Sequence, residues 1–430
     1  MTKLTIIGAG SAVFTKNIVA DLLSLDSFKN IEIALQDIDP KRLKASHDLL
    51  TVISQKLNAN PKITSHTNRR ESLAGSDFVQ TTIQVGGYKP STVIDFEIPK
   101  KYGLRQTIAD TLGVGGIMRA LRTIPILKEI LSDIEKVCPN AIILNYVNPM
   151  VMLCMAINRI APELKMVGLC HSVQGTAEQL AEDLNENISD ISYLCAGINH
   201  MSFYLSFVKK QDGITEDLYP RLRKIIKQGK VPADNLVRYE VLKRFGYFVT
   251  ESSEHFSEYT PWFIKRDRPD LIKNYNIPLD EYIVRCKKQI ADWDKQKKKL
   301  EDVNQKLEIC QSHEYAASII NGLENNKEVI INGNVENKGF IENLPSNISV
   351  EVPCLINKKG IQPQKIGVLP IQLSALMMTN INVQQLTVEA ALSGKKEYIY
   401  HAAMLDPHTA AELSVDEICN LVDDLLLAHG

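Results

Sequence analysis

Short apolar runs alternate with longer amphipathic segments through the first 190 residues of the chain. Runs of this kind are typical of strands buried on both faces, and the longer segments are typical of helices. The predicted strands are residues 4–8, 31–35, 78–83, 141–145 and 165–169. The predicted helices are residues 15–25, 41–57, 119–137 and 151–160. Because strands that alternate with helices form parallel sheets, the pattern predicts an α/β fold with a doubly wound parallel sheet and right-handed crossovers.

The alternation ends near residue 190, and a different pattern follows. Residues 193–197 and 203–208 are predicted strands of a mixed sheet, and residues 279–307 and 372–391 are predicted helices. The segment 332–348 is rich in Asn and contains Gly and Pro, which predicts a loop. We therefore expect two domains, residues 1–190 and 191–430. The second is expected to be α+β, to hold substrate and oligomer contacts, and to pack against the carboxyl edge of the first sheet.

Composition narrows the class of protein. The chain has 430 residues and 44% hydrophobic content, which is enough for a large core. A net charge of -2 gives no basic field, so we expect neither nucleic acid nor membrane as a partner. No apolar run reaches the roughly 18 residues that cross a bilayer. The start lacks a signal-peptide pattern and the eight cysteines are scattered, so we expect a cytoplasmic protein without a disulfide framework.

A glycine-rich turn joins the first predicted strand to the first predicted helix. Gly8, Gly10 and Ser11 would place free backbone N–H groups at the helix N-terminus, where a pyrophosphate binds. The third glycine of the G-x-G-x-x-G pattern is missing, because position 13 is Val. Asp37 ends the second strand and would accept hydrogen bonds from ribose hydroxyls while repelling a 2′-phosphate. The turn therefore favours a Rossmann-type NAD site, with a plain tight turn as the alternative.

Cys170, at the same edge of the sheet, and His200, in a second loop, are candidate metal ligands. Cys170 follows the strand 165–169, and His200 follows the strand 193–197. Two ligands cannot close a structural zinc site, which needs four. An open site completed by substrate oxygens would suit Mn²⁺, Fe²⁺, Co²⁺ or Ni²⁺, among which the sequence does not choose. Packing is the commoner role of a cysteine near a histidine, and it stays the alternative.

Three further segments carry polar groups suited to a small ligand. Asp110 opens a glycine-rich stretch that leads to Arg119, and three glycines there permit close backbone approach. Asn148 ends another strand, where an amide can both donate to and accept from a sugar hydroxyl. Residues 246–262 concentrate titratable and aromatic side chains, as in the wall of a sugar site. The alternatives are an ordinary loop for the stretch after Asp110, a helix N-cap for Asn148 and a surface loop for residues 246–262.

Taken in order, these motifs resemble those of family 4 of the glycoside hydrolases over essentially the whole chain. Members of that family depend on NAD and are exceptions among glycosidases, most of which use a pair of carboxylates. The matching motifs are Gly8-Ala-Gly10-Ser11, Asp37-Ile-Asp39, Asn148-Pro149, Cys170-His-Ser-Val173 and Asn199-His200. In this family the residues after the cysteine track the substrate, and Cys-His-Ser-Val is similar to the subgroup that acts on α-galactosides. The resemblance implies hydrolysis of α-galactosides such as melibiose by oxidation, elimination, addition and reduction at C3, C2 and C1.

The resemblance also implies roles for individual residues and an assembly. Cys170 and His200 match the ligands of Mn²⁺ or another divalent transition metal. His171 stands where some members carry an acid, and histidine's ordinary pKa of about 6.5 suits a proton donor. Asn148 matches a residue beside the substrate and the metal. Members of the family are commonly dimers or tetramers, so a homodimer or homotetramer is expected.

The base that removes the C2 proton is the least defined part of the site. Asp110 falls where the family places a carboxylate facing the site. It is expected to take part in catalysis and to bind substrate, and Arg119 is expected to bind substrate. Other members use a tyrosine in the segment that corresponds to 254–259, but this segment departs from their pattern. His255, Tyr259 and a hydroxide on the metal all stay candidates for the base.

Three alternative functions stay open at this point. The chain could be a family 4 enzyme for α-glucosides or α-glucuronides. It could be a 2-hydroxyacid dehydrogenase of the lactate or malate type, whose overall architecture it is expected to share. Those enzymes need no metal, so Cys170→Ser would matter little to them. A protein that only binds NAD is the third alternative.

Overall fold

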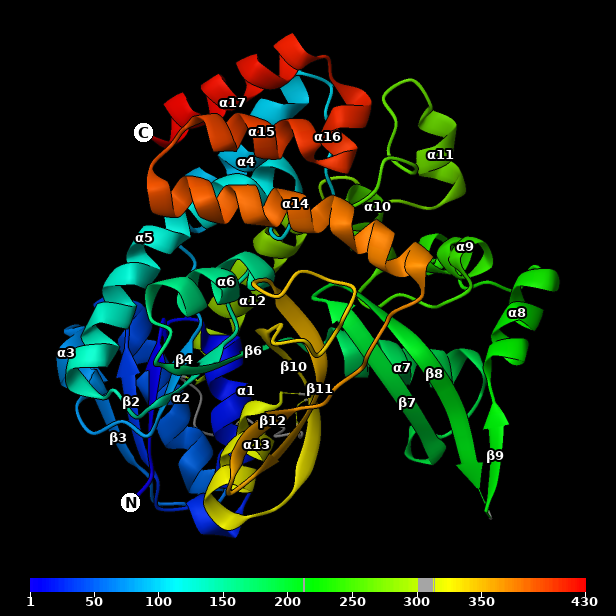
Figure 1. Cartoon of the computed structure of the whole chain (residues 1–430). Helices are drawn as coiled ribbons and strands as arrows, with labels where there is room; N and C mark the ends of the chain where they lie inside the picture. Colours follow the sequence, from blue (N-terminus) through cyan, green and yellow to red (C-terminus); the bar gives the residue numbers. More distant parts are fainter. Residues whose placement is uncertain (212, 301–311, 313) are drawn as a thin grey trace.

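A mixed β-sheet forms the centre of the protein (Figure 1). The computed structural model describes residues 1–211, 213–300, 312 and 314–430. Within these residues the sheet has 12 strands in the order β3-β2-β1-β4-β5-β6-β10-β11-β7-β8-β9, and β12 pairs with β11. Strands from both halves of the chain are therefore neighbours in one sheet.

The first six strands are parallel and form the predicted doubly wound half. Their bounds are Lys3–Ile7 (β1), Glu32–Gln36 (β2), Lys62–His66 (β3), Phe78–Thr81 (β4), Ile142–Asn145 (β5) and Lys165–Leu169 (β6). The order β3-β2-β1-β4-β5-β6 is the one typical of dinucleotide-binding sheets. The predicted α/β class is confirmed. The sequence did not indicate β3, because KITSH is mostly polar and forms no apolar run.

Helices connect the strands of this half. They are α1 (Ala12–Leu23), α2 (Pro40–Lys56), α3 (Arg69–Leu73), α4 (Val93–Lys101), α5 (Gly113–Val137), α6 (Met150–Ile160) and α7 (Ser172–Asp183). The helix predicted from residue 119 begins at Gly113, so the glycines belong to its first turn. A Cβ atom on Gly115 would lie 2.5 Å from the carbonyl oxygen of Ala109. A Cβ atom on Gly116 would lie 2.6 Å from the carbonyl carbon of Thr111. Glycine is needed there because the preceding loop packs directly on the helix.

The remaining strands extend the sheet with antiparallel pairings. They are β7 (Ile191–Ile198), β8 (Met201–Gln211), β9 (Ile214–Asp217), β10 (Val329–Glu336), β11 (Ser349–Asn357) and β12 (Gly360–Pro363). The loop predicted over 332–348 is wrong for 332–336, which belong to β10. Asn332 and Asn334 are tolerated in a buried strand because their amides donate to the carbonyl oxygens of Cys195 (3.0 Å) and Gly168 (3.3 Å).

The second half of the chain contains the remaining α-helices of the described residues. They are α8 (Tyr219–Lys227), α9 (Leu236–Phe245), α10 (Ser253–Glu258), α11 (Pro269–Asn274), α12 (Glu281–Leu300), α13 (Ala316–Asn325), α14 (Ile371–Ser393), α15 (Glu397–Leu405), α16 (Pro407–Glu412) and α17 (Val415–His429). Residues 301–307 of the helix predicted over 279–307 lie outside the described residues. Helices α14 to α17 stand above the sheet together with α4 and the start of α5 (Figure 1).

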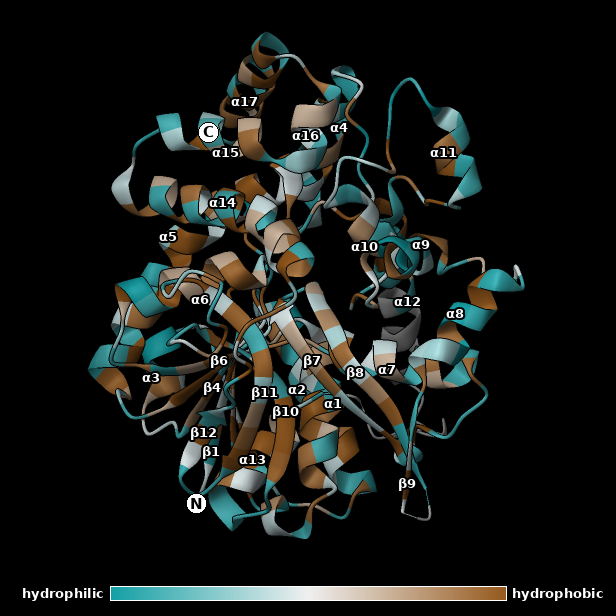
Figure 2. Ribbon diagram, turned by 45° about the vertical axis from the view of Figure 1, so that its right-hand side comes forward, coloured by the Kyte–Doolittle hydropathy of each residue, from teal (hydrophilic) through white to brown (hydrophobic). Residues whose placement is uncertain are grey.

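The hydrophobic core runs through both halves of the chain. Buried side chains of the parallel strands and of β8, β10 and β11 belong to one apolar cluster, and the central strands are largely brown in Figure 2. The division at residue 190 stays a prediction, since the sheet and this cluster both continue across it. None of the described helices combines the length and apolar content that crossing a bilayer requires.

Candidate active site

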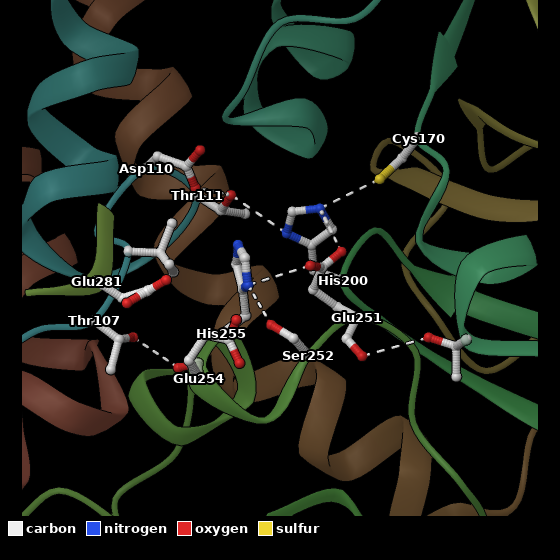
Figure 3. Close-up of polar contacts among 12 residues, drawn as sticks. Thr107, Asp110, Thr111, Cys170, His200, Glu251, Ser252, Glu254, His255 and Glu281 are labelled. Carbon is white, nitrogen blue, oxygen red and sulfur yellow. Dashed lines mark hydrogen bonds and ion pairs between the residues drawn. The ribbon is translucent and has the colours of Figure 1, made fainter. Parts of the chain in front are cut away.

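Cys170, His200 and Glu251 bring three ligand atoms together at the carboxyl edge of the sheet (Figure 3). Cys170 directly follows β6, His200 lies in the turn between β7 and β8, and Glu251 precedes α10. The Cys170 Sγ and His200 Nε2 atoms are 3.4 Å apart, and His200 Nε2 is 3.4 Å from Glu251 Oε2. All three atoms lie within 4.8 Å of one another. The structure thus unites the two predicted ligands and adds a carboxylate.

Two of these residues have an uncommon backbone conformation. His200 has φ 64° and Glu251 has φ 68°, both in the left-handed region. Non-glycine residues held there cost on the order of 1 kcal/mol and concentrate at functional sites. The carbonyl oxygen of Glu251 accepts hydrogen bonds from the buried Arg238 guanidinium and from Thr176 Oγ1, which hold this conformation.

The cluster stabilises a positive charge at His200. Burial alone would lower the pKa of His200, but Glu251 and Cys170 outweigh it and raise the pKa to about 10. Burial would likewise raise the pKa of Glu251, yet His255 and His200 lower it to about 2. The chemistry of the donor set fits a divalent ion, since thiolate, imidazole and carboxylate are ligands for Mn²⁺ and its neighbours in the first transition series.

His255 lies on the other side of the Glu251 carboxylate. Its Nδ1 atom is 3.2 Å from Glu251 Oε1 and 2.8 Å from Ser252 Oγ. Burial lowers the pKa of His255, and the charge on Glu251 opposes that effect only partly. Figure 3 shows its other ring nitrogen directed toward Asp110. A neutral imidazole aimed into the site can take up a proton.

Tyr259, the other side chain predicted as a base, has a different environment. It is fully buried, and its hydroxyl shares a 3.1 Å hydrogen bond with His200 Nδ1. Burial raises the pKa of Tyr259 well above its ordinary value, and the charge on Glu258 adds to the rise. Tyr259 therefore fixes the orientation of the imidazole from behind, which is the usual task of a group bonded to the second nitrogen of a metal-binding histidine.

Asp110, Asn148 and Arg119 form a second polar group beside the cluster. Asn148 Nδ2 donates to Asp110 Oδ2 at 3.3 Å, and Arg119 Nε donates to the carbonyl oxygen of Asn148 at 3.2 Å. Burial would raise the pKa of Asp110, but Arg119, His255 and His200 lower it, so the carboxylate stays charged. These groups can accept from and donate to sugar hydroxyls.

His171 stands at the solvent-exposed side of the site. It is the residue before α7, its side chain is 59% exposed, and its Nδ1 atom lies 3.8 Å from Glu314 Oε1. Its imidazole is exposed to solvent beside Cys170. Its predicted role as proton donor stays a prediction.

The predicted nucleotide turn lies at the end of β1. Gly8 has φ +85°, and a Cβ atom there would lie 2.8 Å from the Thr82 carbonyl. Gly10 N donates to Asp37 Oδ2 at 2.7 Å, and a Cβ atom on Gly10 would lie 2.6 Å from that oxygen. Ser11 precedes α1 without a side-chain capping bond, and the first turn of α1 has no acidic residue. The turn therefore leaves helix N–H groups available to an anion.

Glu251 is the site residue that sequence reasoning missed. The segment 246–262 contains three glutamates, and their spacing alone does not separate them. In the structure Glu254 pairs with Arg285, and Glu258 accepts the backbone N–H groups of residues 107–109. Of the three, Glu251 is the one that faces His200, as a consequence of the turn before α10.

Comparison with known proteins gives the family. The family 4 glycosyl hydrolase model matches residues 3–186, and the model of the family's C-terminal domain matches residues 195–409. This chain belongs to family 4 of the glycosyl hydrolases. The family predicted from the motifs is therefore confirmed.

Individual relatives of this family 4 chain show which proteins its sequence and fold are similar to. It is 49% identical to an α-galactosidase of Bacillus subtilis strain 168 over 100% of this chain and 98% of that protein. Its fold is similar to a 6-phospho-α-glucosidase from gut microorganisms in complex with NAD and Mn²⁺, with TM-score 0.84, 20% identity and coverage of 100% and 98%. A malate dehydrogenase of Cryptosporidium parvum gives TM-score 0.55 at 16% identity over 91% and 99%. The expected dehydrogenase-like architecture is confirmed.

Proposed function

We propose that this family 4 chain is an α-galactosidase that needs NAD⁺ and a divalent metal ion, with Mn²⁺ as the expected ion. One observation carries the proposal. Cys170, His200 and Glu251 converge at the carboxyl edge of a dinucleotide-binding sheet, in a chain 49% identical to an α-galactosidase over its full length. Terminal α-galactosides such as melibiose are the proposed substrates.

The nucleotide would extend from the turn after β1 into a surface cleft beyond β2. Gly8, Gly10 and Ser11 would hold the pyrophosphate, and Asp37 would accept from the ribose. The cleft has a volume of about 770 Å³, and its lining includes Ile38, Arg69, Arg70, Pro125 and Lys128. Ile38 is 91% exposed, which gives an adenine ring an apolar surface to cover. These features support NAD⁺ as the cofactor.

The metal would be held by Cys170, His200 and Glu251, with its remaining positions open to the sugar. When bound, the nicotinamide supplies a reversible hydride acceptor for C3, and the metal ion supplies a Lewis acid for the C2 and C3 oxygens. Asp110, Asn148 and Arg119 would bind and orient the sugar hydroxyls. The site has the parts that an oxidation and elimination route requires.

Proton transfer would be divided between two histidines. His255 is the proposed base for the C2 proton, because its lowered pKa keeps it neutral and its other ring nitrogen faces the site. Tyr259 is a poor base, since its raised pKa keeps the phenol protonated. His171 is the proposed donor to the leaving oxygen, because its exposed imidazole directly follows Cys170 in the chain.

A substrate assay tests the proposal. We expect hydrolysis of p-nitrophenyl α-galactoside and melibiose, and little hydrolysis of the corresponding α-glucosides. Activity should require NAD⁺, Mn²⁺ and a thiol reductant after dialysis against a chelator, and Cys170→Ser should abolish it. Preference for α-glucosides or α-glucuronides would place the chain in another branch of the family. Oxidation of 2-hydroxyacids with net NADH formation would contradict the proposal outright.

The resemblance to family 4 also supports assembly into a homodimer or homotetramer. Light scattering coupled to size-exclusion chromatography measures this directly. A monomer at micromolar concentration would contradict the expected assembly without affecting the proposed reaction.

A further inference from the structure

A buried carboxylate lies behind the metal-binding turn and has no place in the site described so far. Glu351 is on β11 and is fully buried. In the sheet it stands opposite Asn334 of β10 and Gly197 of β7. Strand β10 pairs in turn with β6, which leads to Cys170, while β7 leads to His200 (Figure 1). Glu351 therefore lies on a strand between the two strands that lead to Cys170 and His200.

On the β7 side, Glu351 holds the turn that contains His200. Ser202 Oγ donates to Glu351 Oε2 at 2.7 Å, and Asn199 Nδ2 donates to Oε1 at 3.4 Å. These two donors flank His200 on both sides in the chain. Because the His200 backbone is in the left-handed region, the turn needs contacts that fix it.

On the β6 side, Glu351 acts through Asn334. Asn334 Nδ2 donates both to Glu351 Oε1 and to the carbonyl oxygen of Gly168, each at 3.3 Å. Gly168 is two residues before Cys170, and its pairing with Asn334 joins the parallel half of the sheet to the antiparallel half. A single carboxylate therefore connects the backbone before Cys170 to the turn at His200.

We propose that Glu351 is a positioning residue that sets the separation between Cys170 and His200 and so determines the affinity for the divalent ion. This inference rests on the metal site of the proposed function. The donors that contact Glu351 in the described part of the chain are neutral side chains. Burial raises the pKa of Glu351, while the Ser202 hydrogen bond and the charge on His200 oppose the rise. A cation held by Cys170, His200 and Glu251 would favour the charged form of Glu351 in the same way.

A glutamine would keep an acceptor for Asn199 and Asn334 but would lose the negative charge. Its NH₂ group would then face Ser202 Oγ, and that hydroxyl would have to donate to the carbonyl oxygen of Ile198, 3.1 Å away, instead of to residue 351. Groups that orient metal ligands from the next shell typically change metal affinity by about 10- to 100-fold when mutated. We expect Glu351→Gln and Asn334→Ala to weaken Mn²⁺ binding by such a factor.

The test measures Mn²⁺ binding to the full chain by electron paramagnetic resonance of the free ion, with NAD⁺ binding measured in parallel. Asn332→Ala is the matched control, because Asn332 is buried on the same strand but donates to the carbonyl oxygen of Cys195 instead. We expect this control to bind Mn²⁺ like the parent protein. All variants should bind NAD⁺ like the parent, since the nucleotide turn is on β1. A general loss of structure would weaken both ligands together.

The outcomes separate this inference from the proposed function. If the parent binds Mn²⁺ and both Glu351→Gln and Asn334→Ala bind it equally well, the positioning role is overturned and the metal site stands. The same conclusion follows if Asn332→Ala loses as much affinity as Asn334→Ala. If the parent itself does not bind Mn²⁺, the metal site and the positioning role fail together. Should Glu351→Gln not fold by circular dichroism, Asn334→Ala decides the matter alone.

Discussion

Replacing Glu251 with glutamine tests whether this carboxylate is a metal ligand. The change keeps the shape of the side chain and removes one negative charge 3.4 Å from His200 Nε2. It leaves the carbonyl oxygen of Glu251, and with it the contact to Arg238, in place. We therefore expect the turn to keep its conformation while the site loses attraction for a cation.

The expected magnitude comes from the charge that the site already stabilises at His200. Raising the pKa of His200 from 6.5 to about 10 corresponds to about 5 kcal/mol for one positive charge. Burial acts against this rise in the pKa of His200. Among the groups that produce the rise, Glu251 makes the largest contribution. Its loss should forfeit about 2 to 3 kcal/mol, which is about 30- to 150-fold in affinity for the ion.

Titration calorimetry with Mn²⁺ is the assay for this prediction. Glu254→Gln is the matched control, because Glu254 lies three residues away but pairs with Arg285. We expect the control to stay within about twofold of the parent, a change of about 0.4 kcal/mol. Equal affinity of folded Glu251→Gln and parent protein would show that Glu251 does not bind the ion. Equal losses in the two variants would show a general effect of charge.

Three further predictions concern the metal, the cofactor and the base. In the metal-free protein His200, whose pKa is raised to about 10, carries a proton that Mn²⁺ must displace. The affinity for Mn²⁺ should therefore rise about tenfold per pH unit between about pH 7 and 9. An affinity that does not change with pH in calorimetric titrations would refute this. Gly10→Ala should weaken NAD⁺ binding about tenfold, because its Cβ atom would lie 2.6 Å from a carboxylate oxygen. Gly175→Ala, with open space around it, should not change NAD⁺ fluorescence titrations. His255→Gln should lower kcat by about 10²- to 10⁴-fold, and a larger loss in Tyr259→Phe would reverse the assignment of the base.

Most of the parallel half of the fold could be predicted from sequence because apolar residues dominate most of its strands. Strand β3 could not be predicted because it is mostly polar. Part of β10 was predicted as a loop because Asn332 and Asn334 are residues typical of loops. Their amides are satisfied by carbonyl groups of neighbouring strands, which only the assembled sheet provides. The glycines at the start of α5 were likewise ambiguous, since the sequence does not show that a loop packs against them.

The metal site could be predicted only in part for a similar reason. Cys170 follows β6 and His200 follows β7, and each was singled out by its residue type and motif. Three successive antiparallel pairings make β7 run opposite to β6, so the strand order alone does not bring the two residues together. Glu251 comes from a turn before a short helix, and no periodic pattern determines where such a turn lies. The choice between His255 and Tyr259 depends on burial and on hydrogen-bond partners, which become visible only in three dimensions.

Product analysis in D₂O tests the elimination route most directly. The purified protein would hydrolyse p-nitrophenyl α-galactoside with NAD⁺ and Mn²⁺ present, and the galactose would be examined by proton NMR. The account predicts deuterium at C2 of the product, because a base removes that hydrogen during each turnover. Galactose that keeps its full proton signal at C2 would contradict the account.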